Sequence, residues 1–175
     1  MQKLIHSEIE KTIDLKKLRQ LVPSYVLVKT YDSVRAKTLK EALGDGKYTV
    51  LILLFNIHTK AHRTLNVPGH FFVISTRGPE PAVVFSSTGL TPRKELFITN
   101  SNPTLLDDIL PAGYVVNSMK LQGNDSSNTC WRHAICFCHL APMGLKNYQK
   151  LFSRPAVHLG TADELVTAFT MLSLY

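Results

Sequence analysis

The sequence contains no long hydrophobic run. Its longest apolar stretch, residues 50–55, has the length of a single strand, whereas a membrane-spanning helix needs about 20 apolar residues. The first residues, MQKLIHSEIEK, are charged and lack the apolar segment that secretory signals contain. We therefore expect no transmembrane helix, no secretory signal and no membrane partner.

Cysteine is scarce, and all three cysteines lie in one short window, at Cys130, Cys136 and Cys138. An odd number of clustered cysteines makes a poor disulfide framework, which favours an intracellular, reducing environment.

Acidic residues are outnumbered, because 20 Lys and Arg stand against 13 Asp and Glu, and residues 1–65 carry most of the excess. This basic N-terminal third would favour acidic partners, nucleic acid included, although no aromatic–basic motif accompanies the charge.

Repeats and low-complexity tracts are also absent, and 175 residues with 45% apolar content suit a single domain, residues 1–175. Apolar runs predict strands, and helical spacing predicts helices. The expected strands are residues 25–28, 48–56, 70–75, 81–85 and 113–121, and the expected helices are 4–21, 37–43, 104–110, 134–140, 145–152 and 161–174. This mixture predicts an α+β fold, with a central mixed β-sheet flanked by helices.

Three local patterns sharpen these expectations. The continuous apolar run in residues 48–56 is typical of a strand covered on both faces. A turn at residues 77–79 should join the strands at 70–75 and 81–85 into a hairpin. Thr161 and Glu164 have the spacing of a capping box, which places a helix start at this point.

Cys130 has the context of a nucleophile. A free thiol is mostly protonated at neutral pH, and a helix N-terminus or a nearby imidazolium favours its thiolate. Cap-type residues occupy positions 126–129, and the apolar helical segment follows directly, so Cys130 should lie in the first helical turn. Cys136 and Cys138 lie further along and are expected to be small core residues.

Acyl transfer by a cysteine also needs a base and an oxyanion hole. His70 is the best candidate base among seven histidines, because it opens a strand directly after Gly69. His58 and His62 lie in a polar loop, and His133 and His139 share the helix of Cys130. The backbone N–H of Cys130 could give one oxyanion donor, and the side chain of Gln122, which precedes the loop to Cys130, could give the other. The alternatives are that His70 is an ordinary strand histidine and that Gln122 is a surface residue.

Several segments together resemble the superfamily of cysteine proteases that contains the adenovirus protease (adenain) and the SUMO proteases. GHFFVI (69–74) resembles its Gly-His-Trp strand, and VFSSTGL (84–90) resembles the segment that carries the third catalytic residue. LQGNDSSNTC (121–130) is similar to the Gln-Gly-x-x-Ser…Cys loop of adenain, and Asn56 also fits. The resemblance spans residues 15–152 and implies a papain-like, circularly permuted architecture of the adenain type.

The resemblance implies that Cys130 is the nucleophile, that His70 is the general base and later acid, and that Gln122 stabilises the oxyanion. Two positions depart from the family. Ser86 stands where the family has Asp, Glu or Asn, so either Cys130 and His70 act as a dyad or another residue serves. Trp131 replaces the glycine that commonly follows the cysteine, and its bulk would close part of the cleft or reorient the loop.

The resemblance also bears on partners and location. It implies a polypeptide substrate, either a viral or transposon precursor protein or a conjugate of ubiquitin or a ubiquitin-like modifier. It implies no cofactor, and a location in the host cytoplasm or nucleus or in the virion. No cysteine precedes Cys130, so the disulfide-linked peptide that activates adenain has no attachment point, whereas stimulation by nucleic acid stays open.

Two rival interpretations belong to other functional classes. The pattern C-x2-H-x2-C-x-C-H over residues 130–139 could bind zinc, although structural zinc sites usually draw their ligands from two separate segments. The other rival is an inactive pseudoprotease that serves as a binding module, and Ser86 and Trp131 motivate it. Metal analysis of the pure protein tests the zinc site, and the reactivity of Cys130 tests the pseudoprotease.

Overall fold

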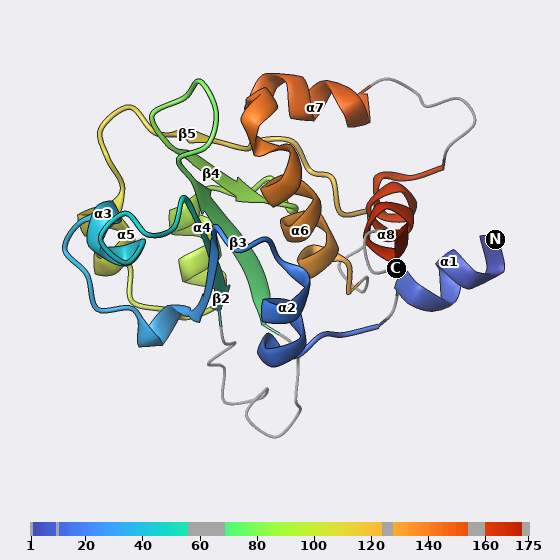
Figure 1. Cartoon of the computed structure of the whole chain (residues 1–175), viewed down its shortest axis with the longest axis horizontal. Coiled ribbons are helices and arrows are strands. Elements are labelled where there is room, and N and C mark those ends of the chain that lie inside the picture. Colours follow the sequence, from blue (N-terminus) through green and yellow to red (C-terminus); the bar gives the residue numbers. More distant parts are fainter. Residues whose placement is uncertain (1, 10, 56–68, 124–127, 154–159, 173–175) are drawn as a thin grey trace.

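A five-stranded mixed sheet forms the centre of the molecule. The computed structural model describes all residues except 1, 10, 56–68, 124–127, 154–159 and 173–175 (Figure 1). The strand order is β1-β2-β3-β4-β5, with β1–β2 and β4–β5 parallel and the pairs between them antiparallel. The strands are β1 (Val26–Thr30), β2 (Val50–Phe55), β3 (His70–Ser75), β4 (Val83–Ser86) and β5 (Val115–Val116). The predicted α+β class and the predicted hairpin, which is β3–β4, are therefore confirmed.

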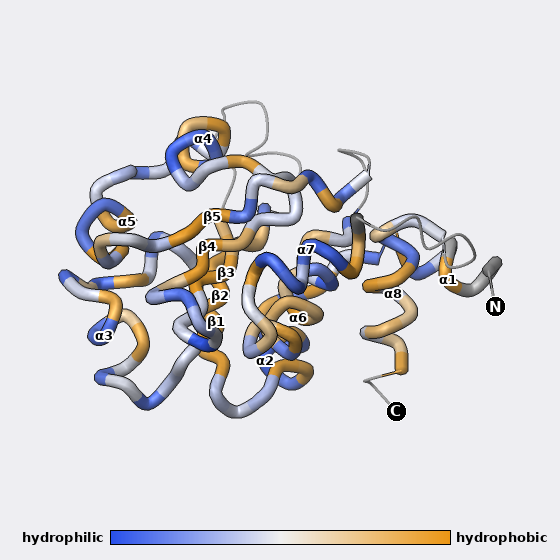
Figure 2. Tube along the Cα trace, turned by 90° about the horizontal axis from the view of Figure 1, so that it is seen from above, coloured by the Kyte–Doolittle hydropathy of each residue, from blue (hydrophilic) through white to orange (hydrophobic). Residues whose placement is uncertain are grey.

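Helices cover both faces of this sheet. One face carries α3 (Leu39–Ala42), α4 (Pro92–Ile98) and α5 (Thr104–Ile109), with the short 3₁₀ turn Tyr31–Ser33 nearby (Figures 1 and 2). The other face carries α2 (Leu15–Leu21), α6 (Cys130–Leu140), the 3₁₀ turn Ala141–Met143 and α7 (Leu145–Ser153). Outside α6 lie α8 (Ala162–Leu172) and α1 (Gln2–Ile9) (Figure 2). Among the described residues, no helix is long and apolar enough to cross a membrane.

The apolar run of β2 is buried on both faces, as predicted. Val50 and Ile52 pack into the core on the α6 side, whereas Leu51 and Leu53 pack into the core on the α3–α5 side. Successive side chains of a strand point to opposite faces, so a strand covered twice needs no polar alternation. Figure 2 shows this central hydrophobic layer edge-on between the two helical layers.

Two predicted elements are shorter than expected. The helix predicted over 4–21 is two helices, because Asp14 accepts a hydrogen bond from the Lys17 amide at 2.7 Å and starts a new helix. The strand predicted over 113–121 ends after Val116, because the Asn117 side chain takes over backbone hydrogen bonding. Its amide donates to the carbonyl oxygens of Ser86 and Met119, and its oxygen accepts from the Met119 amide.

Helix starts are predicted well at two places. Helix α6 begins at Cys130, as the change from polar to apolar sequence indicated. Helix α8 begins after the predicted capping box, in which the Thr161 amide donates to Glu164 at 2.6 Å and the Glu164 amide donates to the Thr161 hydroxyl at 3.3 Å. Helix α4 was not predicted, and it supplies a residue of the site described below.

Candidate active site

The structure brings Cys130 and His70 together, although they belong to different layers. Cys130 is half-buried at the N-terminus of α6, and its thiol forms a hydrogen bond with the His70 imidazole. Burial by itself would lower the pKa of His70. The hydrogen bond with Cys130 and the charges of Cys130 and Glu95 outweigh burial, so the pKa of His70 is raised above 6.5.

The register of the sheet fixes the direction of the His70 side chain. It is the first residue of β3 and pairs with Phe55 of β2, so its side chain lies on the face that α4 covers. Phe72 lies two residues further along that face and pairs with Ser86, which makes His70 and Ser86 diagonal neighbours. Gly69 precedes His70 because a Cβ there would lie 1.7 Å from the carbonyl oxygen of Phe55. No side chain fits at that position.

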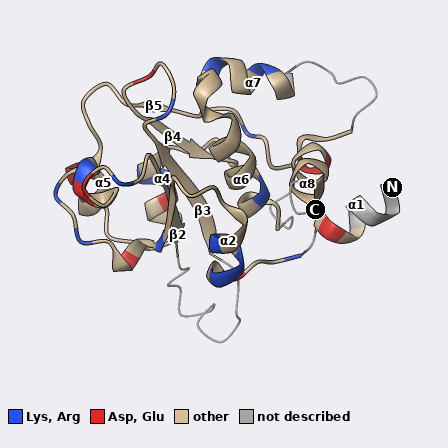
Figure 3. Cartoon of the chain, viewed as in Figure 1, with Lys and Arg blue, Asp and Glu red and all other residues tan. Residues whose placement is uncertain are grey.

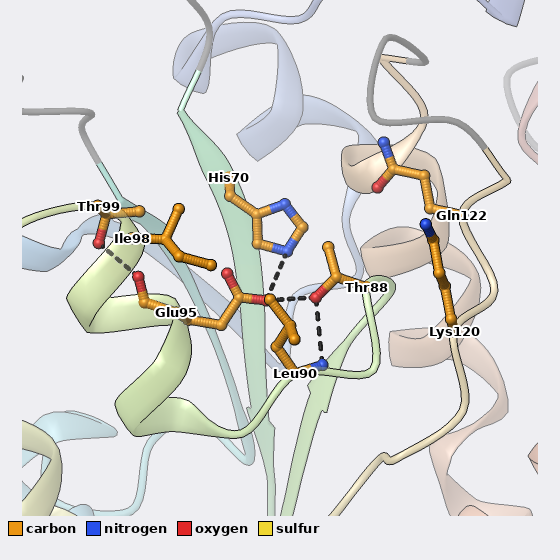
Figure 4. A pocket seen from close by; sticks show the side chains of 8 residues that line it. All are labelled: His70, Thr88, Leu90, Glu95, Ile98, Thr99, Lys120 and Gln122. Atoms are coloured by element: carbon orange, nitrogen blue, oxygen red, sulfur yellow. Dashed lines mark hydrogen bonds and ion pairs between the residues drawn. The ribbon is translucent and has the colours of Figure 1, made fainter.

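Ser86 connects His70 to a buried carboxylate. The Ser86 hydroxyl lies 2.9 Å from Nε2 of His70 and donates a hydrogen bond of 2.6 Å to Oε1 of Glu95. The hydroxyl of Thr88 donates to the same carboxylate oxygen. Glu95 is only 3% exposed, and its Oε1 is 3.5 Å from Nε2 of His70. A negative charge therefore lies behind the histidine (Figure 4).

These hydrogen bonds set the tautomer of His70. The Ser86 hydroxyl gives its proton to Glu95, so it can only accept from Nε2 of His70, which must carry a hydrogen. Nδ1 is then the basic nitrogen of the neutral ring. Figure 4 shows that this nitrogen points away from Glu95, toward the side of the pocket where Gln122 lies. The orientation of the His70 ring is thus fixed by a third group.

Glu95 is the residue of this candidate site that the sequence interpretation missed. Ser86 was placed correctly beside the histidine, and the charge that it lacks comes from α4. A signal for this helix was present, since Thr91-Pro92 is a typical helix start with proline at the first position. Pro92, Glu95, Leu96 and Thr99 are the buried positions and have helical spacing, so the sequence places a carboxylate on the core face of α4.

Gln122 lines the same pocket as His70, as predicted. The amides of Leu121 and Gln122 both donate to the carbonyl oxygen of Ser87, which anchors this segment to the end of β4. The Ser87 hydroxyl also donates to Oε1 of Gln122 at 2.9 Å. An amide donates only through its NH₂ group, so a hydrogen bond from the Gln122 side chain to an oxyanion would have to come from that group. Ser87 was not predicted to have this role.

The pocket between these residues has a volume of about 490 Å³. Leu90 and Ile98 provide its apolar wall (Figure 4). The polar lining residues are His70, Glu95, Gln122, Thr88, Thr99 and Lys120. A concave, mostly apolar site with a few convergent polar groups is what a reacting carbonyl and its flanking chain would need.

Trp131 does not narrow this pocket, so the prediction that it would close part of the cleft is wrong. Its side chain is 5% exposed and belongs to the core on the α6 side. The indole N–H donates to the backbone oxygen of Lys11 at 3.0 Å, and the Arg132 guanidinium lies 4.1 Å above the ring. The helical turn after Cys130 directs this large side chain into the core and toward the segment after α1.

The remaining histidines and cysteines of α6 have structural positions. Nε2 of His133 lies 2.8 Å from Asp163, and His139 lies against the ring of Phe169. Cys136 and Cys138 are core residues, as predicted, and burial raises the pKa of the Cys136 thiol to about 12. Within the described part of the chain, no three His, Cys, Asp or Glu side chains are grouped to hold a metal ion. Asn56, His58 and His62 lie outside the described residues.

No family model, curated protein or solved structure matches the chain. The chemistry of the site must therefore be inferred from its own geometry. That geometry comprises a thiol at a helix start, an imidazole backed by a carboxylate, and a side-chain amide beside the same pocket.

Replacing Glu95 by glutamine should shift the alkaline limit of activity to lower pH. The charge of Glu95 helps to raise the pKa of His70, so the imidazolium persists to higher pH in the wild type. An imidazolium is needed to protonate a leaving group, so activity falls as pH rises through the pKa of His70. We expect the E95Q profile to fall earlier, with a rate loss of about 10-fold or more at neutral pH. The pH dependence of kcat measures this, and Asp107→Asn, at an exposed position of α5, is the matched control. An unshifted profile would contradict the role of Glu95.

Proposed function

We propose that this protein is a thiol hydrolase, and more specifically a cysteine endopeptidase of the adenain-like class. The observation that carries the proposal is the hydrogen-bonded pair of Cys130 and His70, with Glu95 behind the histidine through Ser86. A surface thiol with an incidental neighbour would not need a buried carboxylate to orient that neighbour. Arrangements of this kind activate nucleophiles in hydrolases.

The proposed reaction follows from the positions of these groups. Nδ1 of His70 takes the proton of the Cys130 thiol, and the sulfur attacks the substrate carbonyl carbon. The resulting oxyanion accepts hydrogen bonds from the Cys130 amide and the Gln122 side chain. The C–N bond breaks as His70 protonates the leaving amine, which leaves a thioester. Water then attacks the thioester, gives its proton to His70 and releases the acid product and the thiol.

The finer fold assignment is part of the same proposal. The order along the chain is a histidine at a strand start, then the orienting group, then glutamine, then the cysteine at the start of a helix packed on the sheet. This order supports the permuted, adenain-like arrangement of a papain-like enzyme. The location inside a host cell or in a virion belongs to the proposal in the same way.

The proposed substrate is a polypeptide, with a viral or transposon precursor as the first candidate and a ubiquitin-like conjugate as the second. The deciding experiment digests a mixed peptide library with wild type and with C130A, and identifies new termini by mass spectrometry. Sequence-specific internal cleavage by the wild type alone supports an endopeptidase. Release of a fluorophore only from the C-terminus of a ubiquitin-like protein would favour the deconjugating enzyme.

The pseudoprotease alternative loses the two features that motivated it. Trp131 is packed in the core, and the charge missing at Ser86 is present at Glu95. An inactive scaffold would be recognised by a Cys130 thiol whose alkylation rate does not depend on His70. The pH dependence of alkylation in wild type and H70A, with Cys136 and Cys138 replaced, measures this directly.

Nucleic acid is a further proposed partner, through exposed Lys16 and Lys17 on α2. Figure 3 shows Lys and Arg positions grouped on that helix. The third basic residue of α2, Arg19, instead donates to the carbonyl oxygen of Val28 at 3.1 Å, so its guanidinium has a structural partner. Binding that does not weaken with added salt would argue against this contact.

Replacing Gln122 by alanine should slow acylation without slowing alkylation. p-Nitrophenyl acetate acylates a thiolate through an oxyanion, whereas iodoacetamide alkylates the same thiolate without one. Removing one oxyanion donor costs about 10²-fold or more in rate. We therefore expect acylation of Cys130 in Q122A to fall by about that factor, while its alkylation rate changes little. Gln149→Ala, which removes another amide near Asn117, is the control. Equal acylation rates in Q122A and wild type would remove Gln122 from the mechanism.

A further inference from the structure

One carboxylate, Asp163, contacts both ends of the segment that separates the two proposed oxyanion donors. Its Oδ2 accepts from the Gly123 amide at 2.9 Å, directly after Gln122. Its Oδ1 accepts from the Thr129 hydroxyl at 2.5 Å, directly before Cys130. Asp163 therefore connects the residues next to Gln122 and Cys130.

Asp163 is itself held firmly. It is 6% exposed and lies in the first turn of α8, where the positive end of the helix dipole favours a carboxylate. The capping box of Thr161 and Glu164 fixes this turn. Nε2 of His133, one turn after Cys130 on α6, lies 2.8 Å from Oδ1 of Asp163 and joins the two helices. Burial alone would raise the pKa of Asp163, but hydrogen bonds from His133, Thr129 and Gly123 outweigh it and lower the pKa.

An oxyanion hole works only when its two donors keep their separation. Donors must stay within about 0.5 Å of the productive geometry, and a misplacement of about 1 Å can cost roughly 10²-fold in rate. A single carboxylate that accepts from both ends meets this need.

We propose that Asp163 is a positioning residue for catalysis, which sets the distance between the Gln122 amide and the Cys130 amide from the C-terminal helix. It acts on the proposed oxyanion donors through Gly123, Thr129 and His133. The inference rests on the proposed function, because it assigns Asp163 to the oxyanion hole of that reaction. It also gives α8, which lies outside α6 in Figure 2, a part in the chemistry.

The test compares two reagents on the same thiol in Asp163→Asn, with Cys136 and Cys138 replaced throughout. An asparagine has one acceptor oxygen, so it cannot accept at both ends. We expect acylation of Cys130 by p-nitrophenyl acetate to slow by about 10- to 100-fold, and alkylation by iodoacetamide to stay within about three-fold of wild type, because an SN2 reaction forms no oxyanion. Glu164→Gln is the matched control, since it weakens the same helix turn but keeps the Asp163 carboxylate.

The outcomes separate a positioning role from a structural one. Wild-type acylation in D163N would overturn the proposal, and so would equal losses of acylation and alkylation in D163N and E164Q. If D163N does not fold, Thr129→Val removes one end of the connection from a buried position of similar shape. The same selective loss of acylation in T129V supports the proposal, and its absence overturns it. Failure of the proposed function gives a different result. In that case Cys130 would be alkylated at the same rate in wild type and in His70→Ala.

Discussion

Replacing Cys130 by alanine should abolish peptide hydrolysis. No other thiol can take over, because Cys136 and Cys138 are buried in the core and burial raises their pKa values strongly. Removal of the nucleophile of a comparable catalytic triad costs about 10⁴-fold or more in kcat. We expect a loss of that size in kcat/KM, measured on a peptide found by the library digestion. Position 130 is half-buried at a helix start and tolerates alanine, so the melting temperature should change little.

Cys136→Ala is the control for this experiment. It removes a buried thiol from the same helix and should lower stability while leaving kcat nearly unchanged, because Cys136 lies in the core and does not line the pocket. Near-normal cleavage by C130A would remove the whole mechanism. Equal losses in C130A and C136A would show that packing of α6, and not chemistry at sulfur, explains the effect.

Replacing His70 by alanine should have the second largest effect, a loss of about 10²- to 10⁴-fold in kcat. His70 acts twice in the proposed reaction, as the base for the thiol and as the acid for the leaving amine. Its raised pKa keeps the imidazolium available above pH 6.5, so the wild-type rate should fall only at higher pH. In H70A that alkaline fall should vanish, since the group that titrates is gone. Alkylation of Cys130 in H70A should keep rising with pH, as for a thiol without a partner.

Ser86→Ala provides the graded comparison for His70. It removes the hydroxyl between His70 and Glu95 but leaves the carboxylate 3.5 Å from Nε2, so part of the electrostatic support remains. We expect a loss of about 10-fold, clearly smaller than that of H70A. A loss as large as that of H70A would make Ser86 a full member of the catalytic group. A pH profile of H70A identical to that of wild type would show that another residue is the base.

Much of the fold could be predicted because its signals are local. The burial of β2 follows from one apolar run, and the start of α8 follows from two residues three positions apart. The elements that differ from the predictions also have local causes, which the structure makes visible. Asp14 divides one expected helix, and Asn117 ends one expected strand. Side-chain competition for backbone groups is hard to weigh from sequence, because caps and turns use the same residue types.

The sequence by itself determined the members of the candidate site that carry chemistry. Cys130 stands where polar sequence turns into an apolar helix, and His70 opens a strand after the one residue that fits there, Gly69. Tertiary structure alone decided which groups support them. Glu95 reaches His70 across Ser86, Trp131 turns into the core, and Asp163 joins Gly123 to Thr129. Such contacts arise from the packing of helices on both faces of a sheet, so no spacing along the chain encodes them.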